Sequence, residues 1–152
     1  MIATDTHAAL AHHPFLIGWN ESFIEMLCGC AQMIGVPAGQ HLFHAGQPAD
    51  AFFLVINGRV ALEMEAGPKG HVCIQTAGPG EVIGWSSFSH PECWRFSARV
   101  LEPVRAVEID GAAMRRLCEE NHELGYGLLK RLVNVMAERL TATRAQLLSH
   151  LE

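Results

Sequence analysis

Residues 39–58 read GQHLFHAGQPADAFFLVING, and this stretch decides the fold. It contains a short β-prone run, a Gly-Gln-Pro turn, and an apolar run over Ala51–Ile56 that ends in Asn57-Gly58. Its three glycines supply turns that a residue with a Cβ atom would strain. Asn-Gly between two β-prone runs is the strongest short-range hairpin signal. The stretch therefore predicts strands on both sides of a hairpin turn at Asn57-Gly58.

The same alternation of short β-prone runs and turn residues extends over residues 33–110. Glycine, proline and asparagine recur every several residues, and the runs between them are too short for helices. Many short strands with regular turn signals predict an antiparallel barrel or jelly roll. The expected strands are Gln40–His44, Ala51–Ile56, Arg59–Glu65, His71–Thr76, Glu81–Ile83, Phe96–Leu101 and Val104–Ile109.

Helical patterns flank this region on both sides. Asn20 and Ser22 are N-cap residues ahead of an apolar helical pattern. After Gly111 the turn residues stop, and the pattern predicts a short helix that ends near Asn121 and a long helix that follows it. The expected fold class is mainly β, an antiparallel β-roll (jelly roll) with a long C-terminal helix. We expect one domain over residues 1–152, with an N-terminal helix in 15–32, the roll over 33–110 and helices over 111–152.

The long helix carries an apolar stripe with steps of four and three residues, which is heptad spacing. This heptad stripe consists of Leu129, Val133, Met136, Leu140, Thr143 and Leu147. A second stripe, formed by Leu128, Leu132 and Val135, runs beside it. Either both stripes pack on the roll of the same chain, or one of them pairs with a partner helix. We favour the second alternative and expect a homodimer through the C-terminal helix.

Composition narrows the classes of function. The 152 residues carry a net charge of −5, whereas nucleic-acid binders usually show a basic excess, so we expect no nucleic-acid partner. No apolar run approaches the roughly 18 residues of a membrane span, and the first residues lack the pattern of a secretory signal. The five cysteines are odd in number and scattered, which is typical of reduced thiols. We expect a cytoplasmic protein without a membrane partner.

Three segments resemble the cyclic-nucleotide-binding domains of the catabolite activator and fumarate-nitrate regulator family. Residues 39–58 resemble the opening of that domain, and residues 78–84, GPGEVIG, resemble the start of its phosphate-binding cassette. Residues 136–143, MAERLTAT, look like its long C-terminal helix. The resemblance implies a β-roll in which a short helical turn presents backbone N–H groups to a cyclic phosphate.

The cassette itself, residues 84–96 (GWSSFSHPECWRF), departs from the pattern of members that bind cyclic AMP. Those members have a glutamate after the cassette glycine, which accepts a hydrogen bond from the ribose. Here Trp85 follows Gly84, and an indole is only a donor. The family also places an arginine near the end of the cassette. Counting forward from Gly84 gives Arg95, whereas alignment from the next strand gives Trp94, and both alternatives stay open.

On the long helix, the resemblance puts Thr143 where cyclic-AMP sensors contact the adenine and Arg139 where helix and ligand are coupled. Alternatively, both residues are ordinary residues of a family helix. Three roles are open for the cassette aromatics Trp85, Phe88 and Trp94: they fill the core, they line an apolar pocket for a flat ligand other than a nucleotide, or the cassette binds a cyclic nucleotide through rearranged contacts. No cofactor is assigned, and a cyclic nucleotide is the candidate ligand. The candidate ligand contacts are Gly84, Trp85, Ser86, Arg95, Phe96, Arg139 and Thr143.

A cupin-like metal-dependent enzyme is the alternative, because cupins share the jelly roll. His41, His44, Asp50 and His71 are the residues that such a site would use. Residues three apart on a strand point to opposite faces, so the sequence predicts no metal site there. We find no catalytic triad or phosphate-binding loop and expect no enzyme. No helix-turn-helix segment follows the long helix up to Glu152. We therefore expect a ligand-sensing or regulatory module that acts through protein contacts, either by self-association or by docking on an effector protein.

Overall fold

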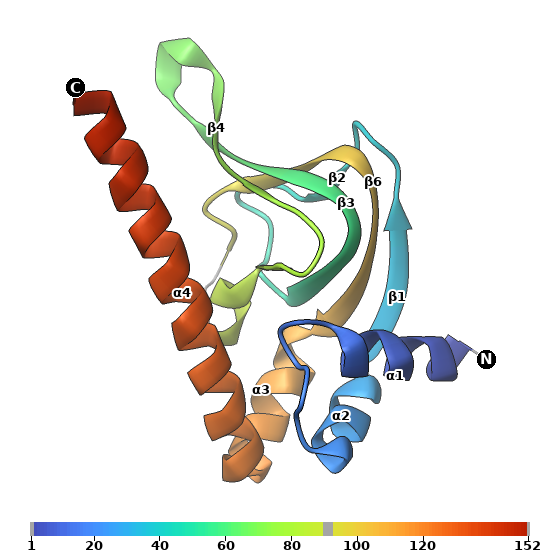
Figure 1. Cartoon of the computed structure of the whole chain (residues 1–152). Coiled ribbons are helices and arrows are strands. Elements are labelled where there is room, and N and C mark those ends of the chain that lie inside the picture. The colour runs from blue at the N-terminus through green and yellow to red at the C-terminus, as the bar shows by residue number, and fades with distance from the viewer. Residues whose placement is uncertain (1, 90–92, 152) are drawn as a thin grey trace. The chain divides into compact units, whose positions relative to one another are not determined.

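The computed structural model of the chain describes residues 2–89 and 93–151. The chain divides into two compact units, Met1–Arg116 and Leu117–Glu152. The first unit contains the roll and the N-terminal helices, and the second contains the long C-terminal helix (Figure 1). The single expected domain is thus built from two units, with the boundary inside the penultimate helix.

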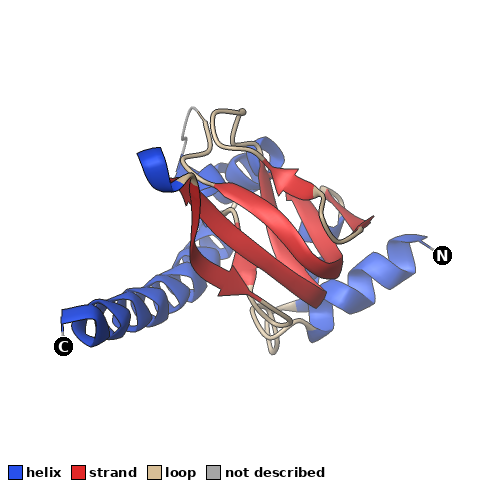
Figure 2. Cartoon of the chain, turned by 90° about the horizontal axis from the view of Figure 1, so that it is seen from above, coloured by secondary structure: helices blue, strands red, loops and turns tan. Residues whose placement is uncertain are grey.

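The roll is a six-stranded antiparallel arrangement (Figure 2). Its main path has the order β1-β6-β3-β4, while β2 pairs with β6 and β5 pairs with β3. The mainly β fold class expected from the sequence is confirmed. The strands are β1 (Ala31–Val36), β2 (His41–Phe43), β3 (Ala51–Glu65), β4 (His71–Ala77), β5 (Val82–Ile83) and β6 (Ser97–Asp110).

Asn57-Gly58 does not form the expected hairpin, because β3 runs through it as one continuous strand. Gly58 has φ +94°, and a Cβ atom there would lie 2.2 Å from the carbonyl oxygen of Pro103 on β6. The strand pairing of β3 and β6 shifts register around this point. Both strands therefore bend together, and the four strands expected around 51–65 and 96–109 are two long bent ones.

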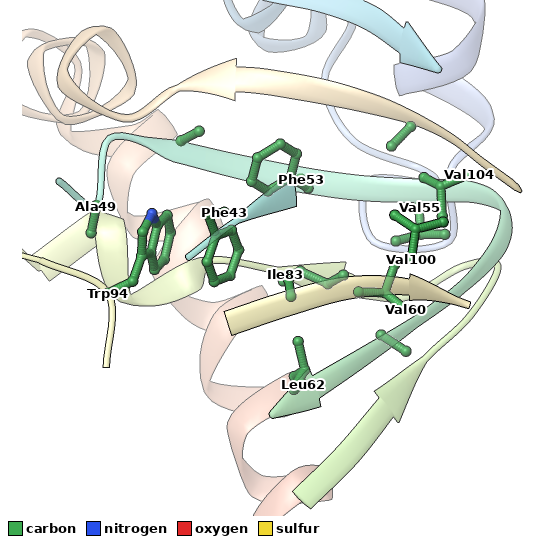
Figure 3. Close-up of a cluster of buried hydrophobic side chains, with 14 residues drawn as sticks. Phe43, Ala49, Phe53, Val55, Val60, Leu62, Ile83, Trp94, Val100 and Val104 are labelled. Atoms are coloured by element: carbon green, nitrogen blue, oxygen red, sulfur yellow. The ribbon is translucent and has the colours of Figure 1, made fainter. Parts of the chain in front are cut away.

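The bend divides the roll into two halves. β2 and β4 pair with the halves of β6 and β3 on one side of it, and β1 and β5 pair with the halves on the other side. Side chains alternate between the faces of a strand, so every second residue enters the interior. The interior positions from the two long strands are Ala51, Phe53, Val55, Val60, Leu62, Ala98, Val100, Val104 and Ala106, all of them buried (Figure 3).

The helix expected within 15–32 is present, and a second helix that the sequence did not reveal precedes it. The two helices are α1 (Ile2–His12) and α2 (Glu21–Cys28), and the chain has entered β1 by Ala31. The Asn20 cap is confirmed, because its side-chain oxygen accepts from the Ser22 N–H at 2.8 Å. The sequence did not reveal α1, since its apolar pattern is interrupted by polar residues over residues 4–7.

His13, directly after α1, is buried, with 4% of its surface exposed. Its Nε2–H donates to the Val55 carbonyl at 2.9 Å, and its Nδ1 accepts from the Phe15 N–H at 3.1 Å. Burial lowers the pKa of His13, although the hydrogen bond to Val55 opposes the shift. This neutral imidazole joins the N-terminal segment to β3 of the roll.

The C-terminal helices begin and end where the sequence predicts. α3 (Gly111–Glu120) is capped by Asp110, whose Oδ1 accepts from the Ala112 N–H at 2.9 Å. α4 (His122–Leu151) is capped by Asn121, which accepts from the Leu124 N–H at 3.1 Å. No helix among the described residues is long and apolar enough to cross a membrane.

The two apolar stripes of α4 differ in exposure. Leu128 and Leu132 of the second stripe are buried. The five apolar residues of the heptad stripe keep between 44% and 61% of their surface exposed. The heptad stripe is therefore the more exposed of the two stripes of α4.

Candidate ligand site in the roll

The cassette begins where β5 ends. Gly84 has φ +83°, and a Cβ atom there would lie 2.7 Å from the Ala51 carbonyl oxygen and 3.0 Å from the Trp94 ring. A larger residue would therefore collide with the backbone of β3. The glycine expected from the resemblance is present, and it lies against an indole ring.

Trp94 fills the part of the roll interior next to Gly84. Only 3% of its surface is exposed, and its ring stacks on Phe43 with centroids 3.9 Å apart and planes 15° apart (Figure 3). Phe53 and Phe96 complete the aromatic cluster, with centroids 6.0 Å and 5.6 Å from that of Phe43. Trp94 is thus core filling, which is one of the three roles that the sequence left open.

The backbone holds Trp94 in this position. Its N–H donates to the Gln47 carbonyl at 2.8 Å, and its carbonyl accepts from the Gly46 N–H at 2.8 Å. Both partners belong to the turn between β2 and β3. The Gly46 turn of the opening segment therefore fixes the far end of the cassette.

The structure distinguishes the two positions that compete for the family's arginine. Trp94 is buried, whereas its neighbour Arg95 is exposed. Both residues precede β6, so their burial rather than strand alternation separates them. The structure thus brings Trp94 to Gly84, and it does not bring the Arg95 guanidinium into the roll.

The short 3-10 helix η2 (Trp85–Ser89) forms the rest of the described start of the cassette. Trp85, Ser86 and Phe88 are half-buried, whereas Ser87 is wholly buried. Arg115 of α3 donates to the Ser87 carbonyl and so ties the cassette to α3. This link was missed because an arginine on an exposed helix pattern gives no signal for a contact 28 residues away. His90, Pro91 and Glu92 lie outside the described residues.

The two candidate contacts on α4, Arg139 and Thr143, lie one turn apart on the helix. The hydroxyl of Thr143 donates to the Arg139 carbonyl at 2.8 Å, one turn back along the helix. Such a bond is common for threonine in helices and needs no ligand. Thr143 is exposed and Arg139 is half-buried.

His41 and His44 do not point to opposite faces as expected. Their rings stack with centroids 4.1 Å apart, because the register of β2 is irregular between His41 and Phe43 and the strand ends there. The pKa of His41 is lowered, first by burial and then by His44. The cupin-type set is nevertheless not assembled, since the metal-type side chains that converge among the described residues are His7, Glu21 and Glu25.

An open hollow of about 500 Å³ lies at the junction of α2 and β1. Its lining includes Cys30, Asp50 and Asp110 but no residue of the cassette. Burial and the nearby Asp110 raise the pKa of Cys30 to about 11. Since the thiolate is the reactive form, this cysteine is a weak nucleophile at neutral pH.

A bent antiparallel roll, a glycine followed by a short helix, and a terminal long helix define the cyclic-nucleotide-binding class of fold. Residues 34–121 match the family described as the cyclic nucleotide-binding domain, and the chain belongs to this family.

One relative is a CRP-like cAMP-activated global transcriptional regulator of Mycobacterium tuberculosis, 31% identical over 139 residues. The match covers 91% of this chain but only 60% of that regulator. Two solved structures are also similar. A cyclic nucleotide-binding domain from Methylobacillus flagellatus KT has a TM-score of 0.85 at 21% identity, covering 97% of this chain and 85% of that one. A putative cyclic nucleotide-binding protein from Geobacter metallireducens GS-15 has a TM-score of 0.78 at 27% identity, and the match covers 89% of this chain and 98% of that one.

Proposed function

We propose that this chain is a cytoplasmic regulatory module that signals through protein contacts. In this proposal its own aromatic side chains fill the part of the roll in which family members bind a nucleotide. In this proposal it is neither an enzyme nor a DNA-binding protein. The observation that carries the proposal is the Trp94 ring, stacked on Phe43 and in contact with Gly84. Aligned from the next strand, the resemblance implies an arginine at this position in members that bind cyclic AMP.

The energetic argument has two parts. An arginine–phosphate pair is a charge-assisted and often bidentate interaction, and an indole cannot replace it. A nucleotide would also have to displace Trp94 from its stack, which forfeits the packing of a large buried aromatic side chain. We therefore expect cyclic AMP to bind more weakly than about 100 μM, or about 5.5 kcal/mol.

Calorimetric titration with cyclic AMP tests this proposal. We expect no saturation below about 100 μM for the wild type or for Trp85→Glu, because Trp94 still fills the roll in both. The double variant Trp94→Arg/Trp85→Glu, if it folds, should gain at least about tenfold in affinity, since it restores both family contacts. A low-micromolar dissociation constant for the wild type would contradict the proposal.

The heptad stripe of α4 is the output surface in this proposal, and a second copy of the chain is its partner. A helix of 30 residues is about 45 Å long, and a stripe with steps of four and three is complementary to itself in a two-fold pair. An exposed apolar strip of that length would favour aggregation in a monomer. An effector protein is the other candidate partner, and the oligomeric state of the chain alone separates the two.

A further inference from the structure

We infer that His7, Glu21 and Glu25 form a binding site for a divalent metal ion of the zinc type, held between α1 and α2. One nitrogen of the imidazole and one oxygen of each carboxylate lie within 4.8 Å of one another. The set combines an imidazole with two carboxylates, which is a donor set that zinc accepts. It is formed by two helices that contact each other.

Each ligand has a clear structural origin. Glu21 and Glu25 are one turn apart on α2, so their side chains share one face of the helix. His7 comes from α1, and its Nε2 lies 2.6 Å from Glu21 Oε1. Within the described residues, the Glu25 carboxylate has no hydrogen bond or ion pair, although it faces the other two groups. One of the three donors is therefore unused in the protein alone.

Electrostatics favours a cation at this point. Two carboxylates so close together repel each other, and one imidazole carries at most one positive charge against their two negative charges. A zinc ion would neutralise the two carboxylate charges and would also be coordinated by the imidazole nitrogen. Zinc bonds of about 2.0–2.2 Å require donor atoms roughly 3.5 Å apart, so exposed side chains need to close by about 1 Å. Magnesium prefers oxygen donors and octahedral geometry, so it suits this set less well.

The site lies outside residues 34–121, the segment that matches the family. It is nevertheless connected to the roll, because α1 leads directly to His13, whose Nε2–H donates to the Val55 carbonyl. An ion that fixes α1 on α2 would also hold the N-terminal segment against β3. The inference is independent of the proposed function, since it concerns neither the cassette nor the heptad stripe.

Calorimetric titration of the full chain with ZnCl₂ tests the inference, with MgCl₂ as the comparison ion. We expect saturable zinc binding in the wild type that weakens at least about tenfold in Glu25→Gln and in His7→Ala. His12→Ala is the matched control, because its ring Nδ1 bonds to the Ala8 carbonyl of its own helix at 2.8 Å. It should bind zinc like the wild type.

Thermal unfolding gives a second measurement that does not depend on binding heat. Zinc at ten times its dissociation constant should raise the melting temperature of the wild type by about 3 °C, and that of Glu25→Gln by much less. Equal zinc affinity in the wild type and Glu25→Gln would overturn the inference, even if other histidines or thiols bind the ion. An absence of saturable zinc binding below about 1 mM would also overturn it.

Discussion

The roll interior and the heptad stripe of α4 both consist of large apolar side chains, but the first set is buried and the second is exposed to solvent. In the roll, Trp94 and Phe43 stack on each other and are almost completely buried. On α4, Val133 and Leu140 remain at least half exposed. The comparison teaches that periodicity in the sequence locates an apolar face. Whether that face is buried within the chain or needs another molecule depends on the surface that packs against it.

The largest expected effect is at the buried end of this comparison. Trp94→Ala should lower the free energy of unfolding by about 3–5 kcal/mol, because it removes a large aromatic side chain from a packed core. The matched variant Trp85→Ala, at a half-buried position, should cost only about 1 kcal/mol. Urea unfolding measures the free energy of unfolding of both variants. An equal decrease in the two would contradict the assignment of Trp94 as the more important core residue.

The bend that creates the interior should be nearly as sensitive. Gly58→Ala should cost about 3 kcal/mol, since the new Cβ would collide with the Pro103 carbonyl and the backbone would be strained. Gly46→Ala is the control, because Gly46 has a similar φ of +92° but no atom within 4 Å of the new Cβ. It should cost about 1 kcal/mol. Equal melting temperatures for the two variants would contradict the close approach of β3 and β6.

His13 should make the attachment of the N-terminal segment to the roll dependent on pH. Its folded-state pKa is lowered, so the unfolded state binds the proton more readily. The stabilisation is complete above the unfolded pKa of about 6.5 and is lost as pH falls through the lower folded value. His13→Gln should cost about 1–2 kcal/mol at pH 8 and show a weaker loss towards pH 5. Melting temperatures across this range measure it, with exposed His12→Gln as the control that keeps the wild-type dependence.

The smallest effect on folding should come from the heptad stripe, where the association changes instead. Met136→Glu with Leu140→Glu should convert a homodimer to a monomer, because four charges would be buried without partners in each dimer. Beyond the loss of association, stability should change by only about 0.5 kcal/mol, since both positions are exposed in the single chain. Sedimentation measures the outcome. A wild-type chain that is monomeric at tens of micromolar would remove the second copy as the partner.

The sequence was sufficient for the fold class because turn residues and short β-prone runs act locally. The hairpin predicted at Asn57-Gly58 was wrong, because these two residues are compatible with either a hairpin turn or a bend in a continuous strand. Only the carbonyl of Pro103, 45 positions further on, decides between them. The helix expected in 15–32 is present as α2, but the sequence did not reveal α1 ahead of it, because the amphipathic pattern of α1 is weak and tertiary structure stabilises the helix.

The site shows the same division. The cassette glycine could be found from its neighbours in sequence, and so could the absence of a glutamate after it. The choice between Arg95 and Trp94 depended on a tertiary contact, because the backbone of Trp94 is hydrogen-bonded to Gly46 and Gln47 in the turn between β2 and β3. The stacking of His41 on His44 depended on an irregular register that no local pattern shows.

The pairing of β6 also has a consequence for how the chain is made. β6 is the partner of β1, β2 and β3, yet it is the last strand in sequence. During synthesis, the strands before residue 97 emerge without the neighbour that most of them require, and a structure with such distant pairings folds slowly. We therefore expect nascent chains that stop before β6 to be unfolded and open to proteases, and protection to appear in one step once residue 110 has left the ribosome.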